Sequence, residues 1–350
     1  MTQTPLQDLR QRAGLLILRG FRGFSLAGDA AVITDLQQRN LGSVILFDVD
    51  GPSGSPERNV QSPQQVRALT DSLRAATGNL PPLIAIDQEG GLVARLKERW
   101  GFPATRSAGE LGAGGDPDAT EAASGALVDV LVAAGINLNL APVVDVDVWG
   151  TNPIIGGKGR SYSADPDEVA AHAGAFIRAH RDRGVLTCLK HFPGHGSSRQ
   201  DSHVGFTDVT LTWSREELIP FQRLLEQGLV DCVMTAHVFN AAFDKTYPAT
   251  LSTAMIKGLL RDELGFDGVV ISDDMGMGAI AKQFGFEEAV ASSLNAGVDL
   301  LALANQTTYE DDITERTVDL IVDLVTSGRL PEKRVDEAAE RVLRLRQRLL

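Results

Sequence analysis

The stretch LTCLKHFPGHGSSRQDSH, residues 186–203, begins like a buried strand and ends as a polar loop. Its first four residues are apolar except for one threonine, and Lys190 and His191 follow them without a break. Two glycines and a proline then indicate a shaped loop rather than a helix or a strand. Three of the six histidines of the chain lie in this stretch. Because a rigid strand that delivers polar groups to a glycine-rich loop is a common way to build a catalytic site, the stretch predicts one here.

Apolar runs of the same kind occur eight times along the chain. They cover residues 15–18, 43–47, 83–86, 138–144, 186–189, 232–236, 268–271 and 299–304. Each run is short and almost continuously apolar, as is typical of strands buried on both faces of a parallel sheet. Longer amphipathic segments separate them. Eight strands that alternate with helices predict an α/β fold, a (β/α)8 TIM barrel that forms a single domain over residues 1–350.

A doubly wound open sheet is the alternative fold for such an alternation of strands and helices. In that fold a G-x-G-x-x-G motif often follows the first strand, and this chain has none there. No shift of composition divides the chain into halves. The barrel is therefore the favoured interpretation.

Several helix boundaries can be predicted from local residue patterns. A small polar residue precedes a proline at residues 62–63, 116–117 and 165–166, where it can cap a helix whose first turn accepts the proline. Ser214 and Glu217 are three residues apart and predict a capping box at the start of another helix. An amphipathic segment over residues 332–350 predicts the last helix.

Composition restricts the partners and the compartment. The chain is 43% apolar and 23% charged, as is usual for globular proteins, and its net charge of −13 argues against nucleic acids and anionic membranes as partners. Residues 1–14 lack an apolar signal core, and no run of about 18 apolar residues occurs, so we expect a cytoplasmic protein without a membrane span. Cys188 and Cys232 lie in apolar runs and are expected to be small buried side chains. We expect a monomer.

Charged and titratable residues follow five successive apolar runs, from the third to the seventh. They are Asp87 and Glu89 with Arg95, Asp145 and Asp147 with Arg160, Lys190 with His191, His237, and Asp273 with Asp274. The carboxyl ends of all strands of such a barrel lie at one face, where barrel enzymes have their active sites. A hydrated rim would be richer in lysine and glutamate and would not follow the apolar runs so directly. We therefore expect these side chains to form one active site.

Four motifs in this chain together resemble those of one enzyme family. They are KHFPGHG at residues 190–196 with DSH at 201–203, DQEGG at 87–91 with Arg95, GRSYS at 159–163, and VVISDDMGM at 269–277. In this combination the chain resembles the glycoside hydrolase family 3 β-N-acetylhexosaminidases, and among them the single-domain bacterial β-N-acetylglucosaminidases of cell-wall recycling. The resemblance extends from about Gly14 to the last helix. It implies a TIM-barrel glycoside hydrolase that acts on a small GlcNAc-containing carbohydrate.

The resemblance also implies roles for individual residues. It makes Asp273 the nucleophile, His203 the general acid/base and Asp201 the residue that orients His203. It assigns sugar binding to Asp87, Arg95, Arg160, Lys190 and His191. Ser197-Ser198 after GHG, and residues 204–207 after DSH, differ from the residues usual in the family but keep its spacing. These departures leave the conformation of the loop and the preferred leaving group open.

The chemistry of these residue types fits the roles that the resemblance implies. Glycoside hydrolysis commonly uses one group at the anomeric carbon and another that protonates the leaving oxygen. Histidine, with an ordinary pKa of about 6.5, suits the second task near neutral pH. Asp274 stays the rival nucleophile, because neighbours at a strand end point to opposite sides. His237 is more often a core residue than a catalytic one. The glycines and serines of residues 194–205 predict a loop that is mobile when no sugar is bound.

We therefore expect a retaining enzyme that removes terminal non-reducing β-linked GlcNAc from peptidoglycan fragments through a covalent glycosyl-aspartate. A β-glycoside phosphorylase or a β-glucosidase of the same family is the alternative. Outside this class, Lys190 could form a Schiff base in an aldolase. A metal-dependent hydrolase is disfavoured because the chain has neither an H-x-H pair on its first strand nor an H-E-x-x-H motif, so we expect no metal and no cofactor.

Overall fold

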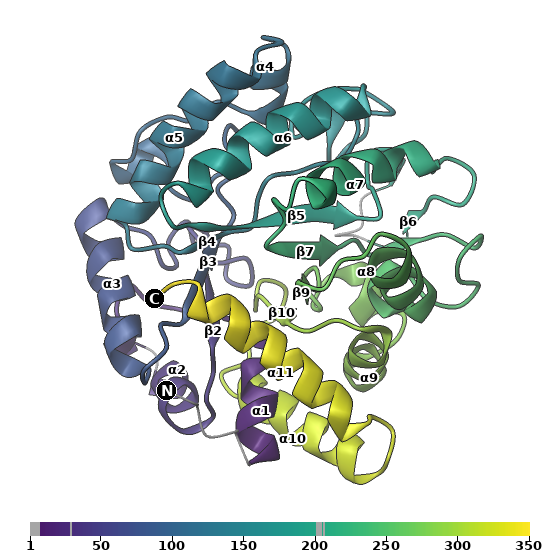
Figure 1. The fold of residues 1–350 in the computed structure, drawn as a ribbon. Coiled ribbons are helices and arrows are strands. Elements are labelled where there is room, and N and C mark those ends of the chain that lie inside the picture. The colour runs from purple at the N-terminus through teal and green to yellow at the C-terminus, as the bar shows by residue number, and fades with distance from the viewer. Residues whose placement is uncertain (1–7, 29, 201–204, 206) are drawn as a thin grey trace.

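A computed structural model describes residues 8–28, 30–200, 205 and 207–350, and in this part of the chain eight parallel strands form one sheet (Figure 1). The strands are, in sheet order, β10 (Leu301–Leu303), β1 (Ile17–Gly20), β2 (Ser43–Leu46), β3 (Leu83–Ile86), β4 (Leu138–Asn139), β5 (Leu186–Phe192), β7 (Cys232–Thr235) and β9 (Val269–Ile271). A parallel bridge between Ile271 and Leu300 joins the two ends of this order. The sheet is therefore a nearly closed barrel, and the predicted (β/α)8 architecture is confirmed.

Helices surround the barrel on its outside, as Figure 1 shows. They are α1 (Leu9–Leu15), α2 (Ala30–Gln38), α3 (Pro63–Ala76), α4 (Ala108–Gly112), α5 (Pro117–Ala133), α6 (Pro166–Arg181), α7 (Ile219–Glu226), a π-helix (Ala254–Glu263), α8 (Gly278–Ala281), α9 (Phe286–Ala296), α10 (Ile313–Thr326) and α11 (Glu332–Gln347). Two short strands, β6 (Thr207–Asp208) and β8 (Val238–Phe239), pair with each other outside the barrel sheet. No helix of the described ranges combines the length and the apolar composition needed to cross a bilayer.

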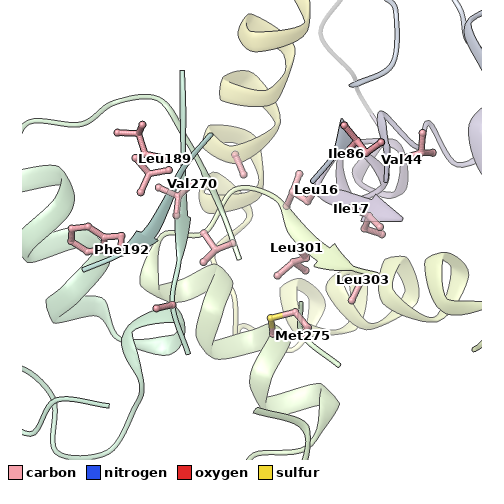
Figure 2. Close-up of a cluster of buried hydrophobic side chains, with 14 of the residues drawn as sticks. Leu16, Ile17, Val44, Ile86, Leu189, Phe192, Val270, Met275, Leu301 and Leu303 are labelled. Carbon is pink, nitrogen blue, oxygen red and sulfur yellow. The ribbon is translucent and has the colours of Figure 1, made fainter. Parts of the chain in front are cut away.

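The hydrophobic core has an inner layer within the barrel and an outer layer between the strands and the helices. Figure 2 shows side chains of the outer layer, among them Leu16, Ile17, Val44, Ile86, Leu189, Phe192, Val270, Met275, Leu301 and Leu303. The inner layer contains alternate residues of the strands, such as Leu186 and Cys188 of β5 and Cys232 of β7. Both cysteines are buried and free, as expected. Because side chains alternate along a strand, Lys190 continues the inward row that begins at Leu186.

Helix α11 closes the amino-terminal end of the barrel. Its Val342 and Leu345 belong to the inner layer. Its Arg334 lies 2.6 Å from the fully buried carboxylate of Asp299, which stands just before β10. Its Arg346 donates hydrogen bonds to the backbone carbonyls of residues 80 and 81, just before β3. The last helix therefore binds the starts of strands and leaves their carboxyl ends open for a site.

The predicted helix starts are confirmed, but one predicted cap is absent. Ser62, Asp116 and Asp165 each cap a helix by accepting a backbone N–H, and a proline follows each of them. The capping box predicted at Ser214 is wrong, because the Ser214 side chain makes no capping bond. The carboxylate of Glu217 accepts backbone N–H groups of residues 196 and 197 instead, across a tertiary contact.

Strands β1 and β4 are among those whose bounds differ from the apolar runs that predicted them. Strand β1 begins only at Ile17, because α1 continues to Leu15. Regular pairing in β4 stops at Asn139, and Pro142 follows, which lacks the N–H that a sheet ladder needs. Pairing with β5 resumes at the bridge between Val143 and Lys190. The carboxyl end of β4 is thus still held beside β5, where the site lies.

Candidate active site

A cavity of about 420 Å³ opens at the carboxyl ends of the strands. Residues of the inner layer such as Ile45, Leu140 and Met234 contribute to its lining. Its wall includes six of the eight residues to which the resemblance gave roles, namely Asp87, Arg95, Arg160, Lys190, His191 and Asp273. Asp201 and His203, the other two, lie outside the described residues. The cavity has the size and the place in the fold of a small-molecule site.

Lys190 lies at the centre of a buried ion cluster in this wall. Its side chain is 2% exposed, and its Nζ lies 2.8 Å from Asp87 Oδ1 and 2.6 Å from Glu89 Oε1. Burial alone would lower the pKa of Lys190, but the two carboxylates outweigh it and raise this pKa above its ordinary value. Lys190 is therefore a fixed positive charge at neutral pH.

Two arginines complete the ion cluster. Arg160 binds Glu89 in a bidentate fashion, with Nε to Oε2 at 2.8 Å and Nη2 to Oε1 at 2.7 Å. Arg95 lies 3.2 Å from Asp87 Oδ2. Burial would raise the pKa values of Asp87 and Glu89, but the charges of Lys190 and the arginines hold both below their ordinary range. The cluster thus holds its donors and acceptors in place before any ligand arrives, as preorganised recognition requires.

The loop after β3 positions Asp87 and Arg95 through the side chain between them. Gln88 is buried, and its Oε1 accepts the backbone N–H groups of Arg95 and Leu96 at 2.9 and 3.0 Å. The Gln88 backbone N–H in turn donates to Asn139 Oδ1 in β4 at 3.1 Å. The loop therefore folds back on itself and directs both charged side chains toward β5.

A second buried group, Asp145, holds His191. Asp145 is fully buried, and its Oδ2 lies 2.7 Å from His191 Nδ1. Its Oδ1 accepts the backbone N–H groups of His191 and His195 at 3.2 and 2.8 Å. Burial would raise the pKa of Asp145, but His191 outweighs it and lowers this pKa. An ionised carboxylate can only accept a hydrogen bond, so the Nδ1 atom of His191 carries a proton. The other ring nitrogen of His191, Nε2, lies 3.4 Å from Arg160 Nη2.

Both Lys190 and His191 reach the cavity although they are neighbours on a strand. The register between β5 and β7 shifts between Leu189 and Phe192. Such an irregularity re-aims a side chain, which is why bulges are common beside active sites. The strand therefore supplies two polar groups to one wall where regular alternation would supply one.

The segment that follows β5 is held tightly over its described part. Residues 193–198 are buried. Asn152 donates to the carbonyls of His195 and Gly196 at 2.8 and 3.0 Å, and a Cβ at Gly196 would lie 1.6 Å from the carbonyl oxygen of Val146. Residues 194–198 are thus buried although glycines and serines have small side chains, because the glycines permit close backbone packing.

Asp273 and Asp274 follow β9, and both line the cavity. Asp274 Oδ1 accepts the backbone N–H groups of Gly276 and Ala304 at 3.2 and 3.1 Å, so it ties this loop to the end of β10. Asp273 Oδ1 accepts the N–H of Asp274 at 2.8 Å. His237 is buried, with Nε2 3.0 Å from the Asp274 carbonyl oxygen and Nδ1 2.8 Å from Thr250 Oγ1. His237 thus supports the loop and is not part of the cavity lining.

Three residues of the site received no role from the sequence. Asp145 directly follows an apolar run and Glu89 stands three residues after one, so the sequence placed both near the ends of strands. Their partners are distant in the sequence, and no local spacing indicates them. Glu217 has the spacing of a capping box with Ser214, and the sequence therefore predicted only a role at the start of a helix. In the described part of the chain, no group of three or more histidine, cysteine, aspartate or glutamate side chains could hold a metal ion.

The fold and the cavity together are those of a (β/α)8-barrel enzyme, with carboxylates and fixed cations at the carboxyl ends of the strands. Residues 9–345 match the glycosyl hydrolase family 3 N-terminal domain, and the chain belongs to this family.

Three similar proteins show how far the likeness extends. The chain is 33% identical over 340 residues to Beta-hexosaminidase A of Pseudoalteromonas piscicida, a match that covers 90% of this chain and 54% of that protein. The structure of a glycoside hydrolase family 3 beta-N-acetylglucosaminidase from Paenibacillus sp. str. FPU-7 has a TM-score of 0.88 and 36% identity, over 98% of this chain and 62% of that one. Beta-N-acetylhexosaminidase from Beutenbergia cavernae has a TM-score of 0.84 and 30% identity, over 98% of this chain and all of that one. The chain thus spans about half to all of the length of these relatives.

Proposed function

We propose that this chain is a retaining β-N-acetylglucosaminidase that hydrolyses terminal non-reducing β-linked GlcNAc. The observation that supports this most is the placement of Asp273 in the same cavity wall as the preorganised cluster around Lys190. A carboxylate at a strand end can attack the anomeric carbon of a sugar that the cluster holds. The family membership and the names of the three similar proteins support the same reaction.

The proposed mechanism has two steps. In the first, Asp273 attacks the anomeric carbon while His203, oriented by Asp201, protonates the leaving oxygen. A covalent glycosyl-aspartate results. In the second, His203 removes a proton from water, which attacks the same carbon and releases the sugar with its configuration retained. The roles of Asp201 and His203 rest on the family resemblance.

The ion cluster and His191 would bind the sugar. Asp87 keeps acceptor capacity for sugar hydroxyls while it is paired with Lys190 and Arg95, because a carboxylate has about four lone-pair sites. Arg160, Lys190 and His191 can donate to hydroxyl and carbonyl oxygens. The charges are paired with one another, so a neutral sugar need not compensate an isolated buried charge.

Asp274 is the weaker candidate for the nucleophile. Its Oδ1 atom accepts two backbone N–H groups, and these hydrogen bonds hold the loop after β9 against the end of β10. An aldolase reaction through Lys190 is also disfavoured. Schiff-base lysines need a lowered pKa, whereas the carboxylates raise the pKa of Lys190.

The remaining parts of the proposal rest on the resemblance to the enzymes of cell-wall recycling. We propose a peptidoglycan fragment as the natural substrate, the cytoplasm as the compartment, and a monomer in which residues 1–350 act as one domain. A phosphorylase or a β-glucosidase of the same family would use the same groups with another acceptor or another sugar.

The test is hydrolysis of aryl β-glycosides of GlcNAc, glucose and GalNAc, with and without phosphate. We expect GlcNAc to be preferred, water to be the acceptor, and NMR to show the β-anomer as the first product. Asp273→Ala should lower kcat by several orders of magnitude while the circular dichroism of the fold is unchanged. An α-anomer as the first product, or an inactive Asp274→Ala beside an active Asp273→Ala, would contradict the assignment of the nucleophile.

A further inference from the structure

Glu217 is a fully buried carboxylate beside the segment that follows β5. It lies in the turn Arg215–Leu218, just before α7. Its Oε2 accepts the backbone N–H of Gly196 at 3.1 Å and that of Ser197 at 3.3 Å. A Cβ at Gly194 would lie 2.6 Å from the Cβ of Glu217, so the segment packs directly on this side chain.

Burial of Glu217 is costly for stability. Within the described residues no cation forms an ion pair with it, and burial raises its pKa to about 7, with a further contribution from the charge of Asp145. An apolar side chain would avoid the cost of burying an ionised group without a counter-charge, but it would leave the N–H groups of Gly196 and Ser197 without this acceptor. A side chain that costs stability and contacts the site is a candidate for a functional role.

The hydrogen bonds around this segment show what Glu217 does. Asp145 accepts the N–H of His195, and Asn152 donates to two carbonyls, so β4 and the loop after it hold one side. The hydroxyl of Ser198 is buried and has no hydrogen-bond partner in the described part of the chain. It therefore does not anchor the segment. On the α7 side two groups hold the segment: Trp213 Nε1 donates to the Pro193 carbonyl at 3.1 Å, and the carboxylate of Glu217 accepts the two N–H groups farther along.

The segment connects two parts of the proposed site. Lys190 and His191 precede it on β5, and Asp201 and His203 follow it within a few residues. We propose that Glu217 is a positioning residue of the active site, which fixes the backbone of residues 196–197 and thereby the point from which the chain continues to Asp201 and His203. This inference rests on the function proposed above. Charge-assisted bonds to two adjacent N–H groups are suited to this task, because they are stronger than bonds to a neutral acceptor.

The test compares Glu217→Gln with Glu216→Gln, the same change at the exposed neighbouring residue. The first substitution keeps the volume of the side chain but offers only a neutral oxygen to the two N–H groups. At pH 8, above the pKa of about 7 so that Glu217 is mostly ionised, we expect Glu217→Gln to lower kcat/KM at least about tenfold for an alkyl or sugar leaving group, since small displacements of catalytic groups have large effects on rate. Dinitrophenyl β-GlcNAc, whose leaving group departs without a proton, should be affected much less. Glu216→Gln should behave like the wild type.

Thermal unfolding separates positioning from a structural role. The pKa of Glu217 is raised from 4.5 in the folded state, so folding favours its protonated form and the wild type loses stability as the pH rises from about 4.5 through about 7. His195, whose pKa burial lowers to about 4, stays neutral over this range. Glu217→Gln lacks this titration and should be at least as stable as the wild type at pH 8.

The outcomes are distinct. Lower activity that depends on the leaving group, with undiminished stability at pH 8, supports the positioning role. Equal losses on both substrates together with a lower melting temperature would show that Glu217 is merely structural, and wild-type activity on both would show that it is dispensable. If the wild type itself does not cleave β-GlcNAc substrates, the proposed function fails and this inference with it.

Discussion

Gly196→Ala tests whether close backbone packing after β5 is needed for activity. A Cβ at this position would lie 1.6 Å from the Val146 carbonyl oxygen and 2.8 Å from its carbonyl carbon. Both are backbone atoms, so no side-chain rotation relieves the collision. Since real Cβ atoms stay about 3.0 Å or more from such neighbours, the segment and the loop after β4 must separate by about 1.4 Å.

A separation of that size breaks the contacts that hold the segment. The Gly196 carbonyl lies 3.0 Å from Asn152, which belongs to the same loop after β4 as Val146, so the separation would stretch this bond beyond useful length. A displacement of about 1 Å at a catalytic group can cost about 100-fold in rate. We therefore expect kcat/KM to fall by about that factor, and the free energy of unfolding to fall by about 1–3 kcal/mol, as is usual for overpacking.

The assay is steady-state hydrolysis of an aryl β-GlcNAc substrate, combined with urea unfolding. Gly78→Ala is the matched control, because a Cβ at Gly78 meets no atom within 4 Å and this glycine is exposed. The control should retain both activity and stability. Wild-type kcat/KM in Gly196→Ala would refute the argument, and so would a loss of equal size in Gly78→Ala.

Two further predictions concern the proposed general acid/base His203 and the amino-terminal end of the barrel. His203→Ala should slow a sugar leaving group by about 100- to 10,000-fold and dinitrophenyl β-GlcNAc much less, and equal effects on both, with substrate binding intact, would remove His203 from its role. Asp299→Asn removes the charge that pairs with Arg261, Arg334 and Arg341, and should lower the free energy of unfolding in urea by about 3–5 kcal/mol with kcat unchanged. Asp267→Asn, at a 77% exposed carboxylate, should cost less than about 1 kcal/mol, and a similar cost at both positions would contradict the importance of burial.

The strands could be predicted from the sequence because their signal is local. Apolar runs bounded by charged residues located β5 and the wall residues Lys190 and His191, since the end of a buried strand is where polarity must change. The early end of regular pairing in β4 could not be predicted in this way. It depends on where Pro142 falls among the hydrogen bonds between β4 and β5, which the sequence of β4 alone does not show. The shift of register in β5 has no local signal at all.

The partners of the site residues could not be predicted in the same way. Ser214 and Glu217 have the spacing of a capping box, but the carboxylate finds its N–H donors about 20 residues upstream, across a tertiary contact. Likewise, the glycines of residues 194–198 have the composition of a mobile loop. In the structure residues 194–198 are buried, because the missing side chains let two backbones touch.

The pairing of β1 with β10 has a consequence for how the protein can be made. Ile17 pairs with Leu301, so almost the whole chain separates the two partners. During synthesis β1 emerges long before β10, and contacts of such large sequence separation form slowly. Until β10 and α11 arrive, β1 presents an unpaired edge to which another nascent chain can add. High yields of this protein should therefore depend on slow translation, low temperature or a chaperone that keeps nascent chains apart until the final helix has left the ribosome.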